Sequence, residues 1–244
     1  MRLGIISDIH GNLPALEATL AALDAARVDR LLCLGDIVGY GPWPNECCEV
    51  VRERKIVTIQ GNHDLAAVQV GAELWFTFPA ARCIIWTRER LSEENSKLLQ
   101  RLPQVRQHEG VTLAHGAIDD PERYVYSWVD AEPSFRLMAT KVGFIGHTHY
   151  QGWFAYDDER KLGQDDITPS GSDLSSDDGR RYIVNPGGVG QPRDGNPAAA
   201  YAIYDSQREL VQLKRVPYDP EPVVSRMLAE GLPESMAVRL REGH

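Results

Sequence analysis

Residues that can bind metal ions follow short apolar runs at five places along the chain. They are Asp8 and His10 in SDIHGN, Asp36 in GDIVGYG, Asn62 in GNHD, His115 in AHG, and His147 and His149 in GHTH. Carboxylates, imidazoles and one amide, with no thiol among them, form a ligand set that suits Mn²⁺, iron or Zn²⁺. Seven ligands are too many for one four-coordinate ion, but they suffice for two ions if one carboxylate bridges them. Two ions about 3.5–4 Å apart would clamp a phosphoryl group for in-line attack and supply hydroxide near neutral pH.

The segments that precede these residues alternate between predicted strands and predicted helices. Apolar runs at 2–7, 31–34 and 56–59 predict buried strands. One helix is predicted after Asn12, which can cap it, and another around 44–54. This β-α-β-α-β order predicts a parallel sheet covered by helices. Loops at the carboxyl ends of parallel strands gather along one edge, so all five polar segments could converge on one point.

The rest of the chain is predicted to continue a single domain of residues 1–244. The stretch 64–102 is predicted to be mostly helical, with breaks near Pro79 and Ser92. Beyond Pro103 the pattern predicts strands at 111–115, 142–146, 152–156, 181–185, 200–205 and 209–216, a helix near 134–140, and C-terminal helices in 219–244 divided at Gly231 and Pro233.

Acidic side chains are concentrated in one part of the sequence. The formal net charge is −9, and residues 157–178 hold eight acids and two bases, so they carry −6 of it. The rest of the chain is close to neutral, which argues against a broad surface for nucleic acid or anionic lipid. We therefore expect no stable nucleic-acid complex. We interpret 157–180 as an acidic loop or hairpin insert, with 163–180 as its flexible tip or loop.

The cysteines and the apolar runs indicate the cellular location of the protein. Cys33, Cys47, Cys48 and Cys83 form no C-x-x-C pair, which argues against a structural zinc site or a thioredoxin-like motif. No apolar run reaches the roughly 18 residues that span a bilayer, and the first residues predict a strand rather than a leader. We therefore expect a cytoplasmic protein without membrane association. The sequence leaves the oligomeric state open.

The ordered set D-x-H, GD, GNH[DE], H and GH-x-H resembles the calcineurin-like metallophosphoesterases from Asp8 to about Pro197. The resemblance implies a four-layer α/β/β/α sandwich of two mixed sheets flanked by helices. It also implies a phosphoric ester hydrolase with two divalent metal ions (Mn²⁺, Fe²⁺ or Fe³⁺, Zn²⁺ or Ni²⁺), in which a metal-bridging hydroxide attacks in line without a covalent enzyme intermediate. Carried over by position, it assigns Asp8, His10 and His149 to one ion, Asn62, His115 and His147 to the other, Asp36 to the bridge, and His63 to phosphate contact and protonation of the leaving group.

The residues after the GD motif depart from the family's Ser/Thr protein phosphatases. Those enzymes carry an Asp-Arg pair where this chain has Gly39 and Tyr40. The Asp supports the catalytic histidine and the Arg grips phosphate, so the departure argues against a protein phosphatase and leaves the partner of His63 open. The segments GYGPWPNEC and NPGGVGQPRDGNP resemble the family's small prokaryotic phosphodiesterases.

That likeness favours a phosphodiesterase acting on a small phosphate ester or nucleotide. The alternatives are a dinucleoside polyphosphate hydrolase or a phosphomonoesterase of the same family, and a non-catalytic scaffold on the same fold. The set of seven ligands together with His63 favours an enzyme over a scaffold, because a scaffold need not keep it.

Three further features could contact a substrate. Arg193 is predicted to touch the substrate phosphate or to form a surface ion pair with Asp194. Tyr40 and Trp43 could stack on a base or an aryl group, or fill the core of their loop. The glycine-rich turn 187–190 could offer backbone N–H groups to a phosphate or be a tight turn between strands. The sequence leaves these alternatives open.

Overall fold

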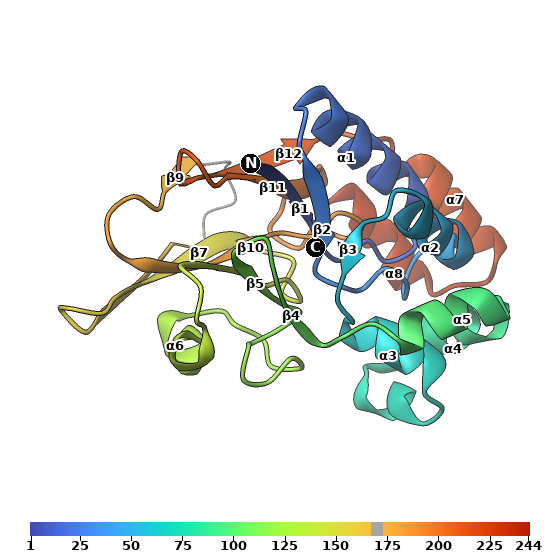
Figure 1. Cartoon of the computed structure of the whole chain (residues 1–244). Coiled ribbons are helices and arrows are strands. Elements are labelled where there is room, and N and C mark those ends of the chain that lie inside the picture. Colours follow the sequence, from blue (N-terminus) through green and yellow to red (C-terminus); the bar gives the residue numbers. More distant parts are fainter. Residues whose placement is uncertain (167–172) are drawn as a thin grey trace.

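The N-terminal part folds as the predicted alternation of strands and helices. The structure is a computed structural model that describes residues 1–166 and 173–244, and Figure 1 shows its course. Strands β1 (Arg2–Ile6), β2 (Arg30–Cys33) and β3 (Val57–Thr58) alternate with helices α1 (Leu13–Ala25) and α2 (Pro44–Glu53). β1 pairs in parallel with β2, and β2 with β3. Asn12 caps α1, because its side chain accepts a hydrogen bond from the backbone of Ala15 (3.2 Å). The predicted parallel sheet is confirmed for these strands.

Two mixed sheets form the centre of the protein. In the described part of the chain, the first has the strand order β3-β2-β1-β11-β12-β9 and the second β4-β5-β6-β10-β7-β8. The further strands are β4 (Val105–His108), β5 (Val111–Ala114), β6 (Val142–Phe144), β7 (Gln151–Asp157), β8 (Leu162–Asp166), β9 (Asp173–Ser175), β10 (Arg181–Pro186), β11 (Ala199–Asp205) and β12 (Leu210–Val216). β1 is antiparallel to β11, whereas β6 lies parallel to both β5 and β10. Each sheet therefore combines both kinds of pairing.

The helical segments fill the remaining parts of the chain. They are α3 (Asn62–Val68), the 3₁₀ turn η1 (Ala72–Trp75), α4 (Phe78–Arg90), α5 (Glu93–Gln100), α6 (Trp128–Leu137), α7 (Glu221–Ala229), α8 (Glu234–Val238) and the 3₁₀ turn η2 (Arg239–Arg241). The breaks expected near Pro79 and Ser92 are confirmed, since α4 begins at Phe78 and Ser92 caps α5. None of the described helices is both long enough and apolar enough to cross a membrane.

Layers of apolar side chains hold the sheets and helices together. Leu16 of α1 and Val51 of α2 pack in a core with strands of the first sheet. Leu3 of the first sheet and Phe144 of the second belong to another core, which joins the two sheets. Phe135 of α6 packs against the second sheet on its other side. Figure 1 shows α1 and α2 beside the first sheet and α6 beyond the second, so the predicted four-layer sandwich is confirmed.

The structure corrects two predictions in the second half of the chain. The interpretation of 163–180 as a loop is wrong in part, because β8 and β9 fall within it and pair with β7 and β12. Residues 167–172 lie outside the described residues. Helix α6 begins at Trp128 rather than near 134, because Ser127 and Asp130 form a capping box ahead of it.

Strand β4 is absent from the sequence prediction. Its first three residues are all exposed, so it lacks the alternation of buried and exposed positions that indicates a strand. It pairs with β5 across a turn in which Glu109 and Gly110 both have positive φ (49° and 79°). Two such residues match the right-handed twist of a tight hairpin. Pairing with β5, rather than local composition, therefore makes this segment a strand.

Candidate metal centre

The five polar segments meet at one edge of the two sheets. Asp8 and His10 follow β1, Asp36 follows β2, Asn62 begins α3 after β3, His115 follows β5, and His147 and His149 follow β6. All of these side chains are buried except Asn62, which is half-buried. The convergence expected from the parallel strands is thus observed, and it draws on both sheets. We refer to these seven residues as the metal centre.

Unusual backbone geometry aims these side chains inward. Five of the seven residues have φ between 50° and 68°: Asp8, His10, Asp36, His147 and His149. Side chains other than glycine rarely adopt this left-handed region, which costs on the order of 1–3 kcal/mol per residue. Its repetition within one small volume indicates that the folded chain holds these residues for a function rather than for stability.

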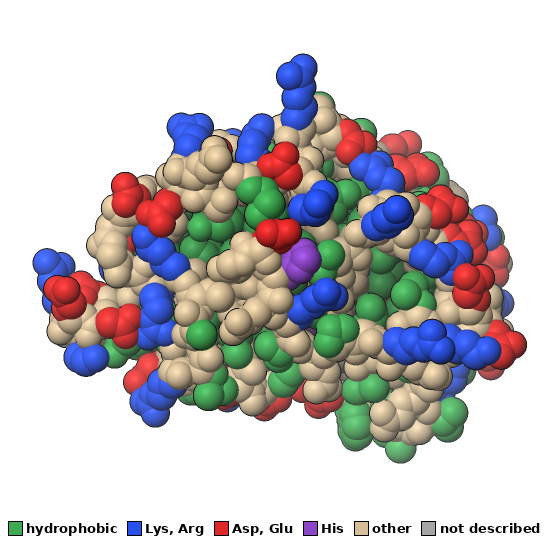
Figure 2. Space-filling model, viewed as in Figure 1, with side chains coloured by type: hydrophobic (Ala, Val, Ile, Leu, Met, Phe, Trp, Pro, Cys, Tyr) green, Lys and Arg blue, Asp and Glu red, His purple; other side chains and the backbone are tan. Residues whose placement is uncertain are grey.

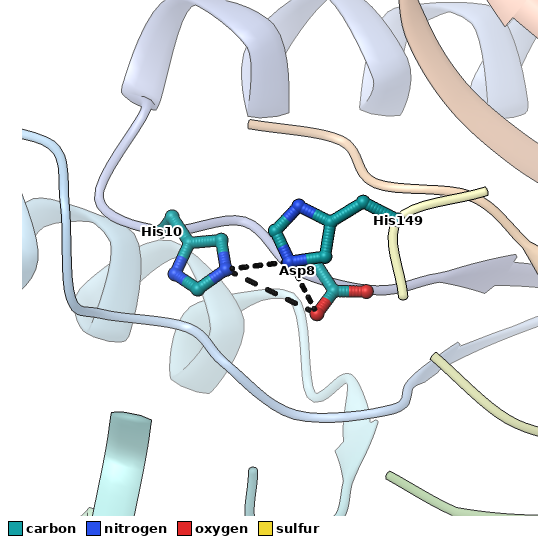
Figure 3. Close-up of side chains that lie close together, drawn as sticks. All are labelled: Asp8, His10 and His149. Carbon is teal, nitrogen blue, oxygen red and sulfur yellow. Dashed lines mark hydrogen bonds and ion pairs between the residues drawn. The ribbon is translucent and has the colours of Figure 1, made fainter. Parts of the chain in front are cut away.

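One cluster contains Asp8, His10 and His149, shown in Figure 3. The distance from His149 Nε2 to Asp8 Oδ1 is 3.3 Å, and from His10 Nε2 to the same oxygen it is 4.0 Å. The two Nε2 atoms lie 3.1 Å apart. One potential ligand atom from each residue therefore points to a common position.

A second cluster contains Asp36, His115 and His147. His115 Nε2 lies 3.3 Å from Asp36 Oδ2 and 3.0 Å from the Oδ1 atom of Asn62. Asp36 Oδ2 also lies 3.5 Å from His10 Nε2, so the same oxygen reaches both clusters. A third grouping of His10, Asp36 and His63 overlaps the first two, which by distance also makes His63 a potential ligand.

The hydrogen bonds of the ring nitrogens show that the metal centre fits cations. In His10 and His149, Nδ1 lies 3.1 Å from the carbonyl of Val38 and 2.5 Å from that of Gln191, respectively. A carbonyl can only accept, so Nδ1 carries the proton and the two Nε2 atoms turn lone pairs toward each other. Two facing lone pairs repel unless a cation lies beside them. Asp36 Oδ2 is likewise buried without a hydrogen-bond donor in the described part of the chain.

Protonation states agree with ligation except at His115. Burial opposes the charged form of His115, but Asp36 and Asp8 raise its pKa to about 9 in the metal-free protein, so a cation would have to displace that proton. Burial lowers the pKa of both His10 and His149, so both rings are neutral near pH 7. Burial opposes ionisation of Asp8, but His149 and His115 outweigh it and hold its pKa below the usual value. The pKa of Asp36 is lowered in the same way, with His115 as the leading histidine. Neutral imidazoles and ionised carboxylates are the forms that bind metal ions.

His63 lies beside the metal centre, against the rings of His10, Tyr40 and Phe76. Its backbone N–H donates to Asp36 Oδ1 (2.8 Å), while its ring atom Nδ1 is buried and unpartnered in the described part of the chain. Gly39 lies against this ring, and a Cβ there would approach Nδ1 to 2.5 Å. Gly39 also has φ of +135°, so a side chain such as Asp would be both strained and blocked. Burial lowers the pKa of His63 to about 4.

Arg193 reaches toward the metal centre rather than toward Asp194. Its guanidinium lies 3.2 Å from the hydroxyl of Tyr40 and over the Tyr40 ring. Its charge helps to lower the pKa of His63 and of His149, which places it on their side of the site. Asp194 instead pairs with Arg215, so the predicted alternative of an Arg193–Asp194 ion pair is wrong.

Of the other predicted substrate contacts, Trp43 and the glycine-rich turn pack or bond within the chain, whereas Tyr40 also borders the site. Trp43 is partly buried in the core that also contains Tyr40, and Arg226 stacks on its ring. Tyr40 both belongs to this core and lines the cleft beside His63. In the glycine-rich turn, the N–H groups of Gly187, Val189 and Gly190 donate within the chain. The turn therefore connects strands, and these three donors are not free for a phosphate.

Sequence reasoning missed the aromatic side chains next to the site. A cleft of about 320 Å³ is lined by Trp75, Phe76 and Tyr124 together with Asn62, His63 and His147. Tyr124 stacks on His147 with 3.8 Å between ring centroids, and His147 Nε2 donates to the carbonyl of Glu122 (3.1 Å). No motif marks these residues, because they come from loops that meet the site only in the folded protein.

Comparison with known proteins agrees with the geometry. The chain matches the calcineurin-like phosphoesterase superfamily domain over residues 1–209. It is 33% identical over 242 residues to an uncharacterised protein of Methanocaldococcus jannaschii, covering 98% of this chain and 96% of that protein. It is 26% identical over 216 residues to the phosphodiesterase YfcE of Escherichia coli, covering 84% and 88%.

A solved structure extends the likeness to three dimensions. The fold superimposes on a metallophosphoesterase from Sphaerobacter thermophilus with a TM-score of 0.88 and 40% identity, over the whole of both chains. The family match covers most of the chain and includes every segment of the metal centre. The chain therefore belongs to the calcineurin-like phosphoesterase superfamily and is a metal-dependent phosphoester hydrolase.

Proposed function

We propose that the protein is a dinuclear phosphodiesterase that hydrolyses a small phosphate ester or nucleotide. The observation that carries the proposal is the position of Asp36 Oδ2, which is within 3.5 Å of both His10 Nε2 and His115 Nε2 and has no donor of its own in the described part of the chain. A carboxylate shared by two ligand clusters is the arrangement that two neighbouring cations need. The likeness to a phosphodiesterase supports the choice of reaction.

In this proposal the two clusters hold different ions. Asp8, His10 and His149 would bind one, and Asn62, His115 and His147 the other, with Asp36 between them. Mn²⁺, iron, Zn²⁺ and Ni²⁺ all suit this mixture of carboxylate, imidazole and amide ligands. When bound, such a pair supplies Lewis acidity and a water of lowered pKa for in-line attack on phosphorus. The carbonyls of Val38 and Gln191 keep the ligating nitrogens unprotonated.

His63 would transfer a proton to the leaving group. In the free protein its pKa is about 4 because the ring is buried, so it is neutral near pH 7. An anionic phosphate beside the ring would favour the imidazolium form, so proton uptake would accompany substrate binding. Gly39 packs against Nδ1 with no side chain of its own, and no acidic side chain of the described residues holds this atom.

Arg193 would hold a phosphate oxygen. Its side chain comes from the loop after β10 and ends at the hydroxyl of Tyr40, the residue that stands where the protein phosphatases have arginine. A guanidinium from another part of the chain would therefore supply the charge that the motif lacks. Its atom Nε is buried without a partner among the described residues, which leaves a donor available.

The direct test compares bis-p-nitrophenyl phosphate with p-nitrophenyl phosphate. Metal-stripped protein receives Mn²⁺, and Asp36→Asn serves as the control. We expect faster cleavage of the diester, lost in the variant. Faster cleavage of the monoester would indicate a phosphomonoesterase. Absence of metal-dependent turnover on both esters would contradict the proposal and favour the non-catalytic scaffold.

A further inference from the structure

Both polar and aromatic side chains line the cleft beside the metal centre. Asn62 and His147 of the metal centre line the cleft together with His63, and Trp75, Phe76 and Tyr124 supply aromatic surface. We refer to it as the aromatic cleft. Its volume of about 320 Å³ is at the low end for small-molecule sites, which span roughly 300–1,000 Å³. It has room for one small group rather than for a polymer.

The aromatic rings touch the residues on which the proposed chemistry depends. Tyr124 stacks on His147 with an interplanar angle of 12°. Phe76 and His63 form a T-shaped ring pair, with 4.8 Å between ring centroids. A group held between these rings would therefore lie directly beside the leaving-group side of the site.

Two of the rings are left open to solvent. Trp75 is 66% exposed on the short turn η1, and Tyr124 is 42% exposed. Tyr124 also stacks on Tyr126, itself 48% exposed, so aromatic surface extends outward from His147. Large rings left in water at the rim of a cleft contribute little to folding but offer flat surfaces for a ligand.

The charges that line the aromatic cleft indicate which kind of ligand group it could bind. The described residues that line it include one acid, Glu122, and no lysine or arginine. Such a lining would repel a second phosphate and accept a neutral group. This disfavours a polyphosphate chain in the cleft, and it favours a flat, uncharged ester substituent.

We infer that the aromatic cleft binds the flat aromatic ring of one ester substituent of the substrate, the base of a nucleoside or an aryl ring, through stacking on Trp75 beside Tyr124. The inference rests on the proposed phosphodiesterase function and adds the substrate class. The group would be the one that departs with the proton from His63, because the cleft opens on that histidine.

The test measures binding rather than turnover. Calorimetric titration of the Mn²⁺-loaded protein compares phenylphosphonate with methylphosphonate, two dianions that resist hydrolysis and differ by the ring. We expect phenylphosphonate to bind about tenfold more tightly, as stacking of one ring predicts. Trp75→Ala should remove most of this preference, and Trp75→Phe should keep most of it. Phe78→Ala is the matched control, because Phe78 is 77% exposed and does not line the cleft.

Equal affinity for the two phosphonates, or a preference that survives in Trp75→Ala, would overturn the inference. The phosphorothioate analogue of AMP separates the two sources of the ring: tighter binding than phenylphosphonate indicates a nucleobase, and weaker binding indicates an aryl group. A ring preference without metal-dependent hydrolysis of any ester would support the cleft and contradict the proposed function. Metal-dependent hydrolysis without a ring preference would support the proposed function and contradict the inferred role of the cleft.

Discussion

Acidic side chains gather in two regions of the molecule, and they behave differently. In the metal centre Asp8 and Asp36 are almost fully buried, and Asp36 Oδ2 has no donor in the described part of the chain. In the acidic segment 157–178, Asp158 accepts from the guanidinium of Arg181 (2.6 and 2.7 Å). Asp178 accepts from its neighbour Arg180 in a similar way (2.7 Å).

The comparison shows that the number of acids does not identify a metal site. The acidic segment carries most of the net charge, yet its carboxylates at Asp158, Asp165 and Asp178 have arginine or backbone partners. None of the metal-binding groupings among the described residues includes it. Figure 2 shows acidic and basic side chains intermingled on the surface in the same way. Deep burial of the carboxylates among imidazoles, with Asp36 Oδ2 left without a donor in the described part of the chain, distinguishes the metal centre.

The largest effect is expected for Asp36→Asn. The amide removes the shared negative charge, so we expect kcat on the diester to fall about 10³-fold and the bound metal to decrease. Steady-state kinetics and metal analysis of the same samples measure both. Asp158→Asn is the matched control in the acidic segment and should keep turnover and metal content. Near-normal turnover of Asp36→Asn at saturating Mn²⁺ would show that the Asp36 carboxylate is no more important for catalysis than that of Asp158.

The next effect is expected for His63→Ala. Removal of the proposed proton donor should lower kcat by roughly 10²-fold or more while both ions stay bound. The loss should be greater for substrates with poor leaving groups, which need the proton most. Metal content distinguishes the roles: a variant that loses an ion would show that the grouping of His63 with His10 and Asp36 is a ligand set.

The metal-free protein should lose thermal stability as the pH falls. Burial lowers the pKa of His63 to about 4 and that of His147 to about 3, against 6.5 in the unfolded chain. The unfolded state therefore binds protons first as the pH falls, and stability is lost between about pH 6.5 and pH 3. Thermal unfolding of protein kept in chelator should show a falling Tm over this range. A Tm that is constant from pH 7.5 to 5 would contradict the buried neutral rings.

The smallest effect is expected in the acidic segment. Asp158→Asn weakens an ion pair with Arg181 in which the aspartate is half exposed, so the free energy of unfolding should fall by at most about 1 kcal/mol. Urea unfolding at low and high salt measures it, and salt should reduce the difference. A loss of several kcal/mol would show that this segment supports the fold more than its exposure suggests.

Much of the metal centre could be predicted because each of its segments follows a strand. The groups that follow β1, β2 and β3 lie at one edge because these strands pair in parallel, and the groups that follow β5 and β6 lie together because these two strands also pair in parallel. Local sequence encodes this part, since each polar residue is fixed by the strand immediately before it.

What could not be predicted depends on contacts between distant segments. Arg193 contacts Tyr40 while Arg215 pairs with its neighbour Asp194, and no spacing in the sequence reveals this arrangement. The stacking of Tyr124 on His147 brings a loop after β5 against a loop after β6. Strand β4 forms only because β5 is available to pair with it.

The proposed mechanism depends on two ions that share Asp36, and anomalous diffraction from crystals of the Mn²⁺-loaded protein would locate them. We expect two peaks about 3.5–4 Å apart on either side of Asp36, one near His149 and one near His115, with no peak in the acidic segment. A single peak, or peaks that survive unchanged in Asp36→Asn, would contradict it.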